Sequence, residues 1–66
     1  MYNYSKLKGR IVEVMGSQKE FAKALGINIS ALSNKLHNKR PFSQDDISKS
    51  IEILGLENPI PYFFTK

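Results

Sequence analysis

The side chains with the clearest chemical potential lie between Ser17 and Arg40, where amides, hydroxyls and cations recur. Amides and hydroxyls donate and accept hydrogen bonds, and lysine and arginine attract polyanions. The chain has no cysteine, a single histidine, His37, and no glycine-rich phosphate loop, so neither a nucleophile with its base nor a set of metal ligands can be assembled. The segment therefore predicts recognition through hydrogen bonds and charge. It does not predict an enzyme, a metal site, a cofactor or a small-molecule substrate.

Positive charge is concentrated in the same segment. The chain has ten lysines and arginines against six carboxylates, a net charge of +4. Five of these cations and only one carboxylate lie between Ser17 and Ser43, and the charges elsewhere cancel. A single surface lysine is most often just solvated. Because the whole excess falls on one short segment, however, we expect a polyanionic partner.

Two short helices joined by a tight turn must position these side chains. The first begins after Ser17, which has capping-box spacing to Glu20, and ends at Gly26, where a left-handed residue is expected. The second begins about three residues later and is capped by either Asn28 or Ser30. Apolar residues of both helices recur at helical spacing and are expected inside: Phe21, Ala22, Leu25, Leu32 and Leu36.

The same pair carries a characteristic spacing of Gln18, Ala22 and Gly26, followed by the apolar Ile27 and Leu32. The small Ala22 lies where a second helix must cross closely, and Gly26 lets the chain reverse without a side-chain clash. This pattern resembles the helix-turn-helix of phage repressor and Cro-like proteins, and the resemblance extends over nearly the whole chain.

The resemblance implies one domain over residues 1–66, with the helix-turn-helix at about residues 17–37. It also implies a small transcriptional regulator of the lysis/lysogeny switch of a temperate phage, acting in the cytoplasm of the bacterial host and binding operator DNA as a homodimer. The second helix of such a pair enters the major groove of double-stranded DNA. Asn34 would then suit an adenine, Ile29 a thymine methyl group, and Gln18 a phosphate oxygen. The predicted DNA- or partner-binding residues are Gln18, Lys19, Asn28, Ile29, Ser30, Ser33, Asn34, Lys35, His37, Lys39 and Arg40.

Two positions depart from the family pattern. Ile29 stands where the recognition helix most often carries a polar, base-reading residue, and Lys35 stands at a position that is often apolar. An exposed isoleucine is covered better by a protein than by the edge of a groove. The second hypothesis is therefore an interaction module that docks on the DNA-binding domain of the phage lysogeny repressor and blocks operator binding. The two activities are compatible if DNA and repressor are bound together.

A helix over residues 4–15 is expected before the pair. Its apolar residues are three and four positions apart, and Leu7, Ile11 and Val14 are expected in the core. Its cations allow a basic membrane-surface helix, but Glu13 and the short apolar face argue against that interpretation. The chain shows neither an apolar run of membrane-spanning length nor the residue order of a signal peptide.

After the pair, residues 44–54 are expected to form a helix. Ser43 and Asp46 have the spacing of a capping box, and Phe42 is placed to pack against this helix as a hydrophobic staple. A last helical turn is expected at residues 60–64, where the aromatic residues either close the core or form a self-association patch. The sequence thus predicts an all-α fold, a compact bundle of about five short helices.

Overall fold

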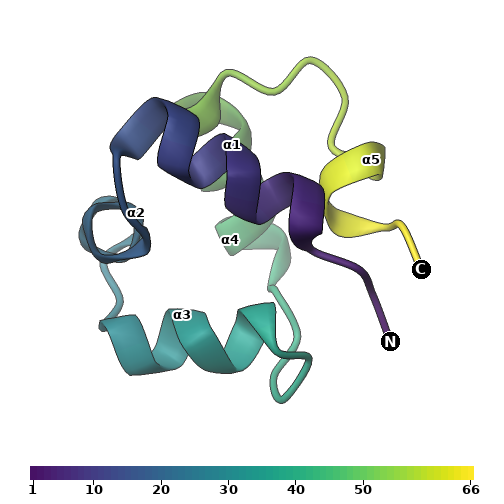
Figure 1. The fold of residues 1–66 in the computed structure, drawn as a ribbon, viewed down its shortest axis with the longest axis horizontal. Helices are drawn as coiled ribbons and strands as arrows, with labels where there is room; N and C mark the ends of the chain where they lie inside the picture. The colour runs from purple at the N-terminus through teal and green to yellow at the C-terminus, as the bar shows by residue number, and fades with distance from the viewer.

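The computed structural model describes all residues, 1–66, and contains only α-helices as regular structure. The five helices are α1 (Ser5–Met15), α2 (Gln18–Leu25), α3 (Ile29–Leu36), α4 (Gln44–Leu54) and α5 (Ile60–Phe63). α1 packs on α2, α4 and α5, and α2 packs on α3 and α4 (Figure 1). α3 runs along the bottom of the view, opposite α1, and the two chain ends lie near each other. The predicted all-α bundle of about five short helices is confirmed.

The turn between α2 and α3 has the geometry that the sequence predicts. Gly26 lies in the left-handed region with φ of 77°, where a side chain would be strained. Its amide donates to the carbonyl of Lys23 at 3.0 Å, and the amide of Ile27 donates to that of Ala22 at 3.0 Å. This pair of bonds is a Schellman motif, which satisfies the last carbonyls of α2 and reverses the chain within three residues.

The helix starts are set by side chains, with one difference from the sequence prediction. Ser43 and Asp46 form the full capping box of α4. At α2, Ser17 Oγ accepts from the Glu20 amide at 3.2 Å, but the Ser17 amide makes no return bond to the Glu20 carboxylate, so the predicted reciprocal box is only half present. Of the two candidate caps of α3, Asn28 serves: its Oδ1 accepts from the amide of Ala31 at 2.7 Å.

The core draws on every helix. Its buried members are Tyr4, Leu7, Ile11, Phe21, Ala22, Leu25, Leu32, Leu36, Leu54, Leu56 and Phe63. The prediction that Val14 lies in the core is wrong, because its side chain is 41% exposed. The inner stripe of α1 runs through Leu7 and Ile11 and continues four residues on to Met15, which packs against the core and leaves Val14 outside.

The aromatic end is divided between core and surface. Phe63 is buried, Tyr62 packs against the core from a half-buried position, and Phe64 is 49% exposed. None of the helices is both long enough and apolar enough to span a bilayer.

Candidate functional site

The outer face of α3 is presented to solvent because its inner face anchors the helix. Leu32 and Leu36 are buried one turn apart. On the outer side, a shallow hollow of about 260 Å³ is lined by Ile29, Ser30, Ser33 and Asn34. Ile29 is 44% exposed there, so an apolar side chain stands among small polar ones. The structure thus brings four of the predicted site residues together.

Several polar groups of α3 are already engaged within the helix. The Asn28 side-chain oxygen is used in the cap. His37 Nδ1 lies 2.7 Å from the Ser33 carbonyl oxygen and 3.3 Å from Ser33 Oγ. Because a carbonyl only accepts, Nδ1 carries the proton, and the other ring nitrogen remains for a partner. Ser30 and Asn34 make no side-chain hydrogen bond, so they are the freest hydrogen-bonding groups of this face.

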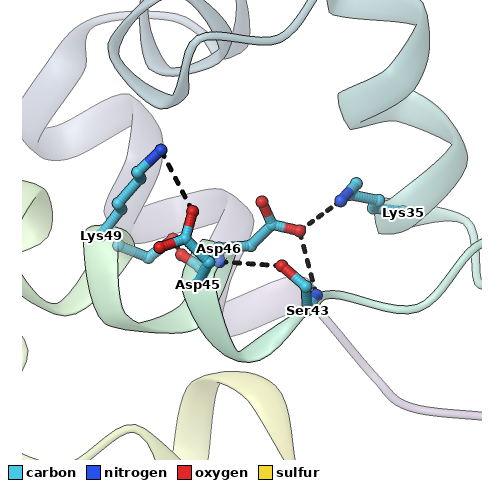
Figure 2. Close-up of polar contacts among 6 residues, drawn as sticks. Lys35, Ser43, Asp45, Asp46 and Lys49 are labelled. Atoms are coloured by element: carbon cyan, nitrogen blue, oxygen red, sulfur yellow. Dashed lines mark hydrogen bonds and ion pairs between the residues drawn. The ribbon is translucent and has the colours of Figure 1, made fainter.

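Lys35 is not placed as the sequence predicts. Its ammonium group forms an ion pair with Asp46 of α4, and the two side chains are only 16% and 12% exposed (Figure 2). Its Nζ also lies 5.9 Å from the centre of the Phe42 ring. The Lys35 ammonium group, predicted to contact DNA or a partner, is therefore engaged by a carboxylate of the protein itself. The Lys35 side chain is directed toward α4, where its charge is balanced by the Asp46 carboxylate.

Asp46 holds this junction through one carboxylate oxygen, Oδ2, and its backbone amide. Its carboxylate accepts from Lys35 and from the Ser43 amide, the latter at 3.0 Å, while its own amide donates to Ser43 Oγ at 3.0 Å (Figure 2). Burial alone raises the pKa of this carboxyl group, but the hydrogen bonds from Lys35 and Ser43, with the Lys35 charge, outweigh burial and bring the pKa below 3.8. The Asp46 carboxyl group is therefore ionised at neutral pH. The outer pair of Lys49 and Asp45, at 3.2 Å, is exposed.

The other cations between Ser17 and Ser43 are free on the surface. Lys19, Lys23, Lys39 and Arg40 are all exposed, and none takes part in an ion pair. Lys39 and Arg40 lie just after α3. Their amides donate to the Asn34 carbonyl at 2.8 and 3.3 Å, which holds them against the last turn of the helix. Cations are favoured at this end of a helix.

Two predicted site residues lie on α2. Gln18 is half-buried and Lys19 is exposed in the first turn of that helix. Neither lines the hollow on α3.

Sequence reasoning missed the residue that fixes the loop after α3. Asn38 has a left-handed φ of 62°, and its side-chain amide both accepts from the Tyr2 amide and donates to the Tyr2 carbonyl, each at 2.9 Å. An asparagine just after a helix is a known signal for positive φ. Its partner lies 36 residues away, which no local signal reveals.

Residues 1–66 match the family described as "Protein of unknown function (DUF739)". The chain belongs to this family. It is also similar to the solution structure of the modulator of repression (MOR) of the temperate bacteriophage TP901-1 from Lactococcus lactis, with 39% sequence identity and a TM-score of 0.78. The match covers 96% of this chain and 86% of that one. Comparison with curated proteins gave no match. The similarity to a phage modulator agrees with the phage-regulator resemblance inferred from the sequence.

Proposed function

We propose that the chain regulates the lysis/lysogeny switch of a temperate phage by docking the outer face of α3 on the DNA-binding domain of the phage repressor. The observation that carries this proposal is Ile29, 44% exposed in the hollow on α3. An exposed apolar side chain that lines a small concavity is a common anchor of a protein interface. Similarity to a modulator of repression supports a role in repression. We place this role in the cytoplasm of the bacterial host.

The lack of exposed charge on the outer face of α3 also favours docking on a protein. Lys35 is the only charged residue of α3, and its ion pair with Asp46 removes that charge from the surface. The core of a protein interface is depleted of charged residues because they must lose their hydration. An uncharged face is also compatible with the basic surface of a DNA-binding domain, which would repel a cationic helix.

One titration tests this docking. The full chain is titrated with the DNA-binding domain of the repressor from the same phage. Ile29→Asp is expected to lower the affinity at least about tenfold, because it removes the apolar anchor and a carboxylate in its place would lose its hydration in the contact. Val12→Asp is the matched control, since Val12 is 54% exposed on α1. Unchanged affinity of Ile29→Asp would count against this surface.

A second candidate function is direct binding of operator DNA, alone or together with the repressor. The observation favouring it is the set of exposed, unpaired cations, Lys19, Lys23, Lys39 and Arg40. Lys39→Ala should then weaken binding to every duplex and reduce the salt slope by about one. Asn34→Ala should cost about 1 to 3 kcal/mol at one base pair only. If the isolated chain shows no salt-sensitive binding to duplex DNA, this candidate fails while docking on the repressor stands. Sedimentation of the same samples measures whether a homodimer forms.

A further inference from the structure

A second concave surface lies where the first residues, the loop after α3 and the last residues meet. This aromatic groove, as we name it, has a volume of about 480 Å³ and is lined chiefly by Tyr2, Tyr4, Phe42 and Phe64, with Lys39 and Arg40. It does not include the hollow around Ile29, which has its own lining. Figure 1 shows the two chain ends side by side at this edge of the molecule.

The walls of the groove are held by specific contacts. The Asn38 side chain forms two hydrogen bonds of 2.9 Å with the backbone of Tyr2, and the Asn3 amide donates to the Thr65 carbonyl at 2.6 Å. The Asn38 bonds tie the start of the chain to the loop that carries Lys39 and Arg40, and the Asn3–Thr65 bond ties the end of the chain to its start. The groove is therefore a built concavity rather than a gap between loose ends.

The aromatic rings of the groove also support one another. Phe42 packs edge-to-face on Tyr4 at 5.2 Å and on Phe63 at 5.1 Å between ring centres. Phe64 meets Tyr2 in the same way at 6.1 Å, with an angle of 86° between the rings. Such pairs are favourable beyond simple burial and hold the rings in place.

The lining combines exposed apolar surface with one sign of charge. Tyr2 and Phe64 are 39% and 49% exposed. Lys39 and Arg40 are exposed and form no ion pair, and no acidic residue is among those that line the groove. Apolar rings next to unpaired cations are complementary to a segment that carries both an apolar side chain and carboxylates.

We propose that the aromatic groove binds an acidic peptide segment of a partner protein, with an aromatic or aliphatic side chain of that segment packed against the exposed surfaces of Tyr2 and Phe64. Carboxylates beside this side chain pair with Lys39 and Arg40, and the planar guanidinium of Arg40 offers two parallel hydrogen bonds to one of them. The interaction is independent of the docking face on α3.

Charge and ring geometry disfavour two other occupants. A two-fold contact between copies would place the same patch on both sides and bring Lys39 and Arg40 of both copies together, which is repulsive. Single-stranded nucleic acid needs open ring faces on which bases stack. Here Phe64 approaches Tyr2 edge-to-face, and Lys66 Nζ lies 6.0 Å from the centre of the Tyr2 ring.

The test uses the full chain and a fluorescein-labelled peptide in which Phe-Leu is flanked on each side by three acidic residues. The comparison probes are the same peptide with Ser-Ser in place of Phe-Leu, the same peptide with lysine in place of every acid, and an oligothymidylate of about the same length. Anisotropy is expected to show binding of the acidic Phe-Leu peptide, about tenfold weaker binding of the Ser-Ser peptide, and none of the lysine peptide. Amide NMR signals of Tyr2, Asn38 and Phe64 should shift on titration.

Variants separate the groove from general attraction and from the face on α3. Phe64→Ser and Arg40→Gln are each expected to weaken peptide binding about fivefold to tenfold. Lys23→Gln, which removes the same charge from α2, and Ile29→Asp, which alters only the hollow on α3, should leave it unchanged. Because Phe64 is half exposed, its variant should fold, which circular dichroism checks. Tyr2→Ser is a second variant of the same wall.

Four results would overturn the proposal. The first is no binding of the acidic Phe-Leu peptide at millimolar concentration. The second is equal loss in Lys23→Gln and Arg40→Gln, which would reveal attraction by net charge alone. The third is tighter binding of oligothymidylate with the same dependence on Phe64. The fourth is a dimer that Phe64→Ser dissociates and that the peptide does not displace. Unchanged repressor affinity in Ile29→Asp would count against the proposed function alone and would leave this proposal standing.

Discussion

Lys35 of α3 and Asp46 of α4 form an ion pair in which both side chains are largely buried, at 16% and 12% exposure. The same carboxylate caps α4 through Ser43, so one group fixes the end of one helix against the start of the next (Figure 2). The pair therefore sets the position of α3 and leaves its outer face uncharged. Lys35, which the sequence predicts as a partner-binding residue, thus helps to hold α3 and α4 together.

Removing the carboxylate should be costly. We expect Asp46→Ala to lower the free energy of unfolding by about 3 kcal/mol, because it leaves the largely buried Lys35 ammonium without a partner and removes the return bond of the α4 capping box. Asp45→Ala is the control, and it should cost less than about 1 kcal/mol because the Asp45–Lys49 pair is exposed. Urea denaturation measures both. Similar losses in the two variants would show that the buried pair does not tie α3 to α4.

The Asp46 carboxyl group should make the free energy of unfolding depend on pH in the acid range. Its pKa in the folded protein lies below 3.8, so the folded state binds the proton less tightly than the unfolded state does. Its contribution is complete above about pH 5 and is lost as the pH falls through 3.8 and then through the lower folded pKa. The difference in unfolding free energy between wild type and Asp46→Asn should be constant from about pH 5 to 7 and shrink below that range. A difference that grows toward acid pH would contradict the sign of the shift.

Local signals explain which parts of the fold the sequence predicts. Gly26 and the Ser43–Asp46 box act within a few residues of their own helix ends, so the bounds of α2 and α4 follow from the chain alone. The exposure of Ile29 follows from the spacing of the buried leucines on α3. The periodicity of α1 predicts Val14 in the core wrongly, because Val14 and Met15 are adjacent apolar residues and only one of them can continue the inner stripe.

Contacts between distant segments explain the rest. The partner of Lys35 lies on another helix, and the partner of Asn38 lies near the start of the chain. Neither spacing carries a periodic signal. The capping box correctly marked Asp46, but that local role gave no sign of a second bond across to α3. The aromatic groove has the same origin, since it exists only once both ends of the chain meet the loop after α3.

Two glycines offer a paired test of backbone conformation. Gly9 lies inside α1, and a Cβ there would meet nothing within 4 Å, so Gly9→Ala should stabilise the protein by about 0.5 to 1 kcal/mol. Gly26 has equal space but a φ of 77°, so Gly26→Ala should destabilise by about 1 to 2 kcal/mol. Thermal unfolding of both variants separates the helical glycine from the left-handed one. Equal shifts of the melting temperature would mean that the turn between α2 and α3 tolerates another conformation.

Asn38 contributes both a left-handed backbone conformation and two side-chain hydrogen bonds to Tyr2. Two substitutions separate these contributions. Asn38→Gly keeps the left-handed φ of 62° at no steric cost but removes both hydrogen bonds to Tyr2. Asn38→Ala removes the same bonds and adds left-handed strain, so it should cost about 1 kcal/mol more than Asn38→Gly. In both variants the Tyr2 amide should lose protection from hydrogen exchange, while the core amide of Leu32 in Asn38→Gly keeps its own. If the Tyr2 amide stays protected in Asn38→Gly, contacts other than these two hydrogen bonds hold the start of the chain against the loop after α3, and the groove wall does not depend on Asn38.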